Sequence, residues 1–264
     1  MASKGCICIL VRSSSTRLPY KWKRTINGVG LLCILINRLT TLDLKAPIFI
    51  CTSDDPKDDE IVGAVQDFDV QVIRGKLDCP ASRMLTALHI SGADYLVRLT
   101  GDNPFIDTSE MQRGMVTFEE GLHDYGYWAG LPVGARPEIF GAKLMHKISS
   151  ALIGLPKGIS EYLTYFVSKN RKVGGIDLID LSSPAYFDYP HSLSIDTISD
   201  LHRISDLVRG SDPTTFFGWL EWRNHDEDGR AARQRFWKLL DATLNSYPED
   251  WQKLFLLSGM SQKG

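Results

Sequence analysis

One aspartate, Asp102, stands where an apolar stretch of the sequence ends in a turn. Residues 95–99 read YLVRL, as expected of a strand buried on both faces, and Gly101 and Pro104 then stop that strand. Open α/β sheets bind ligands at the carboxyl ends of their strands. A carboxylate there suits a hard cation such as Mg²⁺, which proteins usually share with substrate phosphates. An aspartate that bonds to its own turn would show the same local pattern, so the stretch alone leaves both interpretations open.

A second chemical feature is the loop from Arg12 to Lys21. It holds four consecutive hydroxyl side chains and three cations within ten positions. Hydroxyl groups and loop amides donate to phosphate oxygens, and arginine offers a two-pronged donor. Neither G-x-x-x-x-G-K-[ST] nor G-x-G-x-x-G occurs in this loop. A strand followed by such a loop and a helix is how α/β proteins build a phosphate site, although a solvated surface loop has a similar composition.

Acidic residues gather at two further places. Four aspartates within residues 54–59 precede a helical pattern, and helix capping explains them better than a metal site does. Asp196 ends the segment His191–Asp196, which predicts a late strand. Thr197, with Asp200 three residues later, predicts the start of the following helix.

Strands and helices alternate along the first hundred residues, and this alternation predicts the fold. Apolar runs predict strands at residues 5–12, 46–52, 70–74 and 93–99, separated by helical patterns at 31–39, 61–65 and 82–88. We therefore expect an α/β fold, with a mostly parallel, Rossmann-like sheet and helices on both faces. Later helices are predicted at 110–120, 142–152 and 160–168, and strand-like segments at 124–128, 132–140 and 173–181.

The overall composition excludes several classes of protein. The 264 residues carry a formal net charge of -2 and no long basic run, so no nucleic-acid partner is expected. No apolar segment is long enough to span a bilayer, and the first apolar run is too short for a secretory signal. The five cysteines lack a zinc-type spacing. We expect a cytoplasmic protein with no membrane partner.

Taken in chain order, these motifs resemble the cytidylyltransferase family that activates acidic sugars. The closest type is the spore-coat polysaccharide biosynthesis (SpsF-like) type, related to the CMP-Kdo and CMP-sialic acid synthetases. The family's loop A-R-x-x-S-T-R-L-P-G-K stands here as V-R-S-S-S-T-R-L-P-Y-K at residues 11–21. Its patterns T-S-x-D-P-x-D-D, R-G-x-x-D-x-x-x-x-R, R-x-T-G-D-x-P-x-I-D and V-D-T-P-E-D correspond to residues 52–59, 74–83, 98–107 and 195–200.

The resemblance implies a fold of the nucleotide-diphospho-sugar transferase type and a Mg²⁺-dependent transfer from CTP to a sugar or sugar acid. Pyrophosphate would be released, and the product would serve surface polysaccharide synthesis. The implied nucleotide-binding residues are Arg12, Ser14, Ser15, Arg17, Lys21, Gly75, Asp78, Arg83 and Thr100. The implied metal ligands are Asp102 and Asp196, and the implied acceptor-binding residues are Glu138 and Glu161. Arg12, Lys21 and Asp102 are the residues expected to carry catalysis.

Three departures from the family pattern leave alternatives open. Tyr20 replaces a glycine, Val29–Gly30 replaces a Lys-Pro pair, and Ser192 replaces an arginine. One alternative is an enzyme that uses GTP or another nucleoside triphosphate. Another is a catalytically silent relative that binds nucleotide. Relatives of this type are commonly dimers, so a homodimer is also expected.

The composition changes after Pro213, where four tryptophans fall within the last 50 or so residues. The pattern predicts a helix, a polar turn and a second helix, with the aromatic residues forming a packing stripe. We therefore expect a nucleotidyltransferase-like α/β domain at residues 1–210 and a helical C-terminal extension at residues 211–264.

Overall fold

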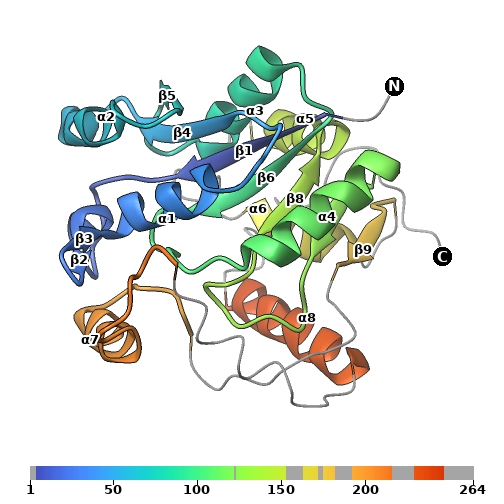
Figure 1. Cartoon of the computed structure of the whole chain (residues 1–264). Helices are drawn as coiled ribbons and strands as arrows, with labels where there is room; N and C mark the ends of the chain where they lie inside the picture. The colour runs from blue at the N-terminus through green and yellow to red at the C-terminus, as the bar shows by residue number, and fades with distance from the viewer. Residues whose placement is uncertain are drawn as a thin grey trace.

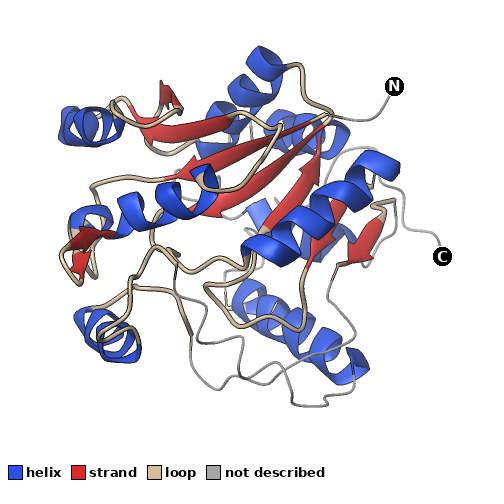
Figure 2. Cartoon of the chain, in the orientation of Figure 1, coloured by secondary structure: helices blue, strands red, loops and turns tan. Residues whose placement is uncertain are grey.

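A seven-stranded sheet forms the centre of the molecule, in the order β5-β4-β1-β6-β8-β7-β9 (Figures 1 and 2). The computed structural model describes residues 4–121, 123–152, 163–171, 175–181, 192–215 and 229–246. The strands are β1 (Gly5–Leu10), β4 (Ile48–Ser53), β5 (Gln71–Gly75), β6 (Tyr95–Thr100), β7 (Tyr125–Tyr127), β8 (Glu138–Gly141) and β9 (Leu178–Asp180). Strands β1, β4, β5 and β6 pair in parallel, and β8 is antiparallel to both β6 and β7. The predicted mostly parallel sheet is confirmed.

Helices cover both faces of this sheet, as its alternating buried side chains require (Figure 1). One face packs against α1 (Leu31–Thr40), α2 (Asp59–Val65) and α4 (Thr108–Glu120). The other packs against α3 (Pro80–Ser91), α5 (Ala142–Ala151), α6 (Leu163–Arg171) and α8 (Gly229–Asn245). A third apolar cluster joins α7 (Ile198–Leu207) to α1 and to the small ribbon of β2 (Thr25–Ile26) and β3 (Val29–Gly30). Among the described helices, none combines the length and the apolarity that crossing a bilayer would need.

The late strand predicted at His191–Asp196 is wrong over residues 192–196, which have no regular secondary structure and do not join the sheet. Their backbone bonds to loops instead: Leu193 N–H donates to the Val133 carbonyl at 2.6 Å, and Ile195 N–H donates to the Asp102 carbonyl at 3.0 Å. An apolar run predicts burial, and here loops rather than a neighbouring strand supply that burial. The predicted helix start at Ser160 and the first half of the predicted C-terminal helix pair lie outside the described residues.

The described part of the C-terminal extension packs on the sheet. The ring of Phe236 in α8 lies 5.0 Å from the ring of Tyr127 in β7, centroid to centroid. The Trp237 ring lies 4.9 Å from the same tyrosine ring. These contacts place two aromatic residues of the predicted packing stripe against the sheet face that carries α3 and α6. The division of the chain at residue 210 stays a prediction.

Gly134 makes the packing of the 192–196 segment possible. Its φ is +91°, and a Cβ at this position would lie 2.2 Å from the backbone nitrogen of Ser194. Gly28 also has a positive φ, of +82°, but a Cβ there would meet nothing within 4 Å. A substitution at Gly28 therefore meets backbone strain alone, whereas a substitution at Gly134 meets backbone strain and a steric clash.

We expect Gly134→Ala to lower the free energy of unfolding by about 3 kcal/mol or more, because strain and a backbone clash add together. Gly28→Ala should cost only about 1–2 kcal/mol, from the left-handed backbone alone. Urea denaturation of the two variants measures both values. Equal losses of unfolding free energy in the two variants would show that the close approach of residue 134 to Ser194 does not add to the cost of the substitution.

Candidate functional site

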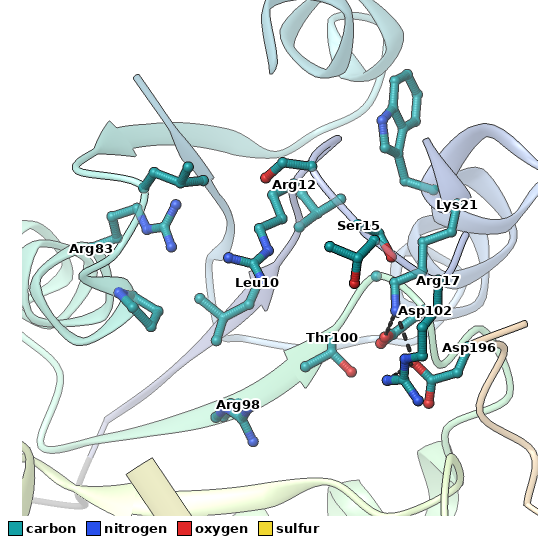
Figure 3. Close-up of a pocket in the computed structure, with 17 residues that line it drawn as sticks. Leu10, Arg12, Ser15, Arg17, Lys21, Arg83, Arg98, Thr100, Asp102 and Asp196 are labelled. Carbon is teal, nitrogen blue, oxygen red and sulfur yellow. Dashed lines mark hydrogen bonds and ion pairs between the residues drawn. The ribbon is translucent and has the colours of Figure 1, made fainter. Parts of the chain in front are cut away.

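A cavity of about 680 Å³ opens at the carboxyl ends of β1 and β6 (Figure 3). These strands are neighbours, with Leu10 paired to Thr100, so the loops that follow them emerge side by side. The polar and charged residues that line the cavity are Arg12, Ser14, Ser15, Thr16, Arg17, Lys21, Arg83, Arg98, Thr100, Asp102 and Asp196. The structure thus brings most of the sequence-predicted nucleotide and metal residues to one place.

The two predicted metal ligands meet on a single ammonium group. Lys21 Nζ bonds to Asp102 Oδ2 and, at 3.1 Å, to Asp196 Oδ1 (Figure 3). Arg17 also donates to Asp196 Oδ1, at 2.9 Å. Lys21 and Asp102 each expose only 18% of their side chains, so water screens this pair less than it screens a surface ion pair. Two carboxylates and two cations therefore form a compact, charge-balanced cluster.

Backbone hydrogen bonds hold the two aspartates close together. The Asp102 carbonyl accepts from Ile195 N–H, the residue directly before Asp196. Thr197 and Asp200 then form a reciprocal capping box at the start of α7, as predicted from the sequence. The backbone on both sides of Asp196 is fixed by these bonds, and its carboxylate is aimed at the cavity.

Tyr20 turns the chain so that Lys21 faces the cavity. It adopts the left-handed conformation, with φ 53° and ψ 36°, which glycine, the residue of the resembled family pattern at this position, adopts without strain. Its ring lies beneath Lys23 Nζ, 4.5 Å from the ring centroid to the nitrogen, and does not line the cavity. The substitution therefore carries a backbone cost of about 1–2 kcal/mol but leaves the site open.

Asp58 is a residue whose role the sequence analysis missed. It is 1% exposed and accepts hydrogen bonds from Ser13 N–H at 2.6 Å, from Ser53 N–H at 3.2 Å and from the Ser53 hydroxyl. Burial raises the pKa of Asp58, but the hydrogen bonds from Ser53 and Ser13 outweigh burial and hold that pKa below its ordinary value. This carboxylate ties the first loop to the end of β4.

The signal for this role was the acidic motif at residues 52–59, which was assigned to helix capping. Capping is correct for Asp55, whose side chain accepts from Lys57 N–H at 2.9 Å. Asp58 precedes α2 but makes no side-chain bond to the helix start. Asp55 and Asp58 of one motif thus have different roles, a helix cap and a tertiary hydrogen-bond acceptor. Only the tertiary contacts distinguish these roles.

Arg83 lies on the other side of the cavity from the lysine–aspartate cluster (Figure 3). It is only 4% exposed, and its Nε and Nη1 are buried without a hydrogen-bond partner in the described part of the chain. Burial lowers the pKa of its guanidinium. A Cβ on Gly75 would lie 3.1 Å from Arg83 Cγ, so the glycine leaves room for this arginine. Gly75 and Asp78 themselves do not line the cavity.

The predicted acceptor residue Glu138 also lies behind the cavity wall and not on its surface. It forms an ion pair with Arg98 and accepts from the Tyr125 hydroxyl and, at 2.7 Å, from the Thr164 hydroxyl. Arg98, which the sequence analysis left without a role, is the member of this group that lines the cavity. Its signal was a charge inside an otherwise apolar strand. Glu161 lies outside the described residues.

A mostly parallel sheet with a cationic loop after its strand β1 is the arrangement of an α/β protein that binds phosphorylated ligands. A family model described as Cytidylyltransferase matches residues 6–152, which is more than half of the chain. The chain therefore belongs to the cytidylyltransferase family and is a nucleotidyltransferase by class. This confirms the resemblance seen in the sequence.

Individual relatives agree with this family and fold. The spore coat polysaccharide biosynthesis protein SpsF of Bacillus subtilis (strain 168) is 29% identical over 208 residues, which cover 76% of this chain and 85% of that protein. A cytidylyltransferase structure from Leptospira borgpetersenii serovar Hardjo-bovis gives a TM-score of 0.67 at 22% identity, covering 95% of this chain and 97% of that one. The CMP:2-keto-3-deoxy-manno-octonic acid synthetase solved with CTP gives 0.58 at 18% identity, covering 78% and 98%. These structures share the fold.

We expect Asp58→Asn to destabilise the protein by about 1–3 kcal/mol near neutral pH, because Ser13 and Ser53 donate to different oxygens of Asp58 and an amide replaces one of these oxygens by an NH2 donor. A carboxylate with a lowered pKa stabilises the fold above its unfolded value of about 3.9, and this contribution is lost as the pH falls through the folded value. The difference in stability between wild type and variant should therefore shrink below pH 4 or so. Urea unfolding at several pH values measures it.

Asp59→Asn is the matched control, because Asp59 exposes 65% of its side chain. It should change stability little at any pH. If the free energies of unfolding of wild type and Asp58→Asn differed by the same amount at every pH, the role assigned to the Asp58 carboxylate would be contradicted.

Proposed function

We propose that this protein transfers CMP from CTP to a sugar or sugar acid in a divalent-metal-dependent reaction that releases pyrophosphate. The observation that carries the proposal is the convergence of Asp102 and Asp196 on Lys21 beside the cationic first loop. The Bacillus subtilis relative is named for spore coat polysaccharide biosynthesis, and we propose a surface polysaccharide precursor as the product here. A homodimer stays a prediction.

The cavity offers a place for each part of the nucleotide. Arg12, Arg17 and Lys21, with the hydroxyls of Ser14 and Ser15, are the donors proposed for the triphosphate. Arg83, on the far side of the cavity, has free donors for the base or ribose. In the transfer, an acceptor oxygen forms a bond to the α-phosphorus while the bond from that phosphorus to the bridging oxygen breaks, and pyrophosphate leaves with the bond electrons. An acceptor hydroxyl releases its proton to water in this step. The cations stabilise the charge that develops on the phosphates.

The donor set fits a divalent metal. Asp102 and Asp196 already approach one cationic nitrogen, and their oxygens are the ligand type that Mg²⁺ prefers. The described residues contain no group of three or more His, Cys, Asp or Glu side chains placed to hold a metal. Phosphate oxygens and water would therefore complete the coordination, as is usual for Mg²⁺ with nucleotides. When bound, the ion would supply charge neutralisation at the α-phosphate.

The proposal of a catalytically silent relative has less support. Its basis was Tyr20, Val29 and Ser192, and none of the three lines the cavity. Val29 lies in the β2–β3 ribbon, and the Ser192 carbonyl accepts from Arg203 of α7. The residues that stand at these three positions therefore do not obstruct the cavity.

We expect Asp102→Asn and Asp196→Asn each to reduce pyrophosphate release from CTP by roughly 100-fold or more, because each removes a carboxylate proposed to hold the divalent ion that offsets the charge of the phosphates. A coupled pyrophosphate assay over a panel of sugars, sugar acids and sugar phosphates measures this. Asp206→Asn, at a side chain 65% exposed on α7, should leave the rate unchanged. Full activity of either cavity variant would refute the proposed roles.

The ammonium group of Lys21 lies between the carboxylates of Asp102 and Asp196. Removing it with Lys21→Met should let Mn²⁺ bind in the absence of nucleotide, because the competing cation is gone. Electron paramagnetic resonance of free Mn²⁺ should show that the dissociation constant of Mn²⁺ is roughly tenfold lower, or lower still, for the variant than for wild type. In the double variant Lys21→Met/Asp102→Asn the gain should disappear. Weaker binding of Mn²⁺ to Lys21→Met than to wild type would argue against a metal site here.

A further inference from the structure

Trp22 lines the cavity, although the sequence patterns that define the site give it no role. It follows Lys21 directly, in the short helical turn η1 (Lys21–Lys23). Only 5% of the residue is exposed, and its ring belongs to the apolar cluster on the sheet face that carries α1. The family pattern at residues 11–21 ends one residue before it. The role of Trp22 therefore has to be found in its contacts.

The indole N–H of Trp22 donates to the hydroxyl of Ser13 at 3.0 Å. Ser13 is 2% exposed, and its other polar atoms are also bonded. Its N–H donates to Asp58 Oδ1 at 2.6 Å, and its carbonyl accepts from the N–H groups of Ser15 at 3.0 Å and Tyr20 at 3.1 Å. Ser13 thus joins the start of the first loop to its end, and both to the carboxylate that ties this loop to β4.

These bonds close residues 13–22 into a loop whose two ends are joined. The residues between the ends include these proposed triphosphate donors: Ser14, Ser15, Arg17 and Lys21. A loop that becomes ordered only when its ligand arrives loses conformational entropy at that moment, which weakens binding. A loop that its own hydrogen bonds have already closed avoids much of this cost. The bond between Ser13 and Trp22 therefore bears on nucleotide affinity, although neither of its atoms is proposed to touch the nucleotide.

The position of Lys21 depends most directly on this arrangement. The residues on either side of it, Tyr20 and Trp22, both bond to Ser13. Trp22 is also held by the apolar cluster to which its ring belongs. The backbone of Lys21 is therefore fixed from both sides, and its ammonium group reaches the two cavity carboxylates from that fixed point.

We propose that Trp22 is a positioning residue: through its bond to Ser13 it presents Lys21 and the loop hydroxyls to the phosphates of the nucleotide. The proposal rests on the proposed function and deepens it, since it assigns part of the affinity for the triphosphate to a residue outside the family pattern. Because the loop faces the phosphates, loss of the bond should weaken the binding of CTP more than that of CMP, which lacks two of the three phosphates.

The test measures the binding of CTP, and separately of CMP, to the full chain by isothermal titration in the presence of Mg²⁺. Trp22→Phe removes the indole donor and keeps an aromatic ring in the apolar cluster. Its dissociation constant for CTP should rise roughly 3- to 10-fold, the usual loss for one hydrogen bond, and that for CMP by about twofold or less. An unchanged dissociation constant for CTP, or an equal rise for both ligands, would overturn the proposal.

Ser13→Ala removes the acceptor of the same bond and tests the proposal a second way. The two single variants and the double variant Ser13→Ala/Trp22→Phe form a cycle. The double variant should bind CTP within about twofold of the weaker single variant, because all three lack the same bond. If the two losses of CTP affinity were fully additive, Trp22 would act on CTP by a route other than Ser13, and the proposal would be wrong.

Trp128→Phe is the matched control for a loss of stability alone. Trp128 is fully buried, its indole N–H donates to Glu110 at 3.2 Å, and it does not line the cavity. Its loss should lower the urea midpoint of unfolding, as Trp22→Phe also should, but leave the dissociation constant of CTP unchanged. A similar rise of that constant in both variants would show that CTP affinity follows stability, and would overturn the proposal. Failure of wild type to bind CTP at all would instead refute the proposed function.

Discussion

The site depends on one ammonium group that two carboxylates share. Lys21, Asp102 and Asp196 come from three separate segments of the chain, and two carboxylates brought this close would repel each other without a cation between them. Lys21 supplies that cation, and the hydrogen bond from Ile195 N–H to the Asp102 carbonyl supplies the backbone constraint. A divalent ion entering this cluster would meet Lys21 and Arg17 as well as the carboxylates. In the proposed function, phosphates that draw these two cations away would make room for the ion, so metal binding would depend on nucleotide binding.

Two other carboxylates shape the site from behind its walls. Asp58 fixes the start of the first loop through Ser13 and Ser53, and Glu138 fixes Arg98. Each is nearly saturated with donors, and neither lines the cavity. Acidic residues in a nucleotide site therefore fall into two groups with different environments. Those that face the cavity, Asp102 and Asp196, pair with Lys21 and Arg17 at its surface. Those behind the cavity wall hold the groups that face the cavity.

The sequence predicted the parallel core of the fold well, because four apolar runs separated by helical patterns allow few other arrangements. The capping box of α7 could be predicted because it is local: Thr197 and Asp200 lie only three residues apart. It failed where the outcome depended on distant partners. The residues before Asp196 bond to loops and do not form a strand, because the carbonyls of Val133 and Asp102 accept from their N–H groups. The roles of Asp58 and Arg98 escaped notice because neither can be recognised without the residue each one contacts.

The balance of charge in the cavity differs from that of the whole chain, and this difference bears on selectivity. Five cationic side chains line the cavity, those of Arg12, Arg17, Lys21, Arg83 and Arg98, against two carboxylates, Asp102 and Asp196. The excess of three positive charges stands in a protein whose formal net charge is -2. A cationic cavity with low-dielectric walls concentrates small anions even where the net charge of the whole protein is slightly negative. Glu138 offsets the charge of Arg98 from behind the cavity wall, so the excess at the cavity falls to about two positive charges.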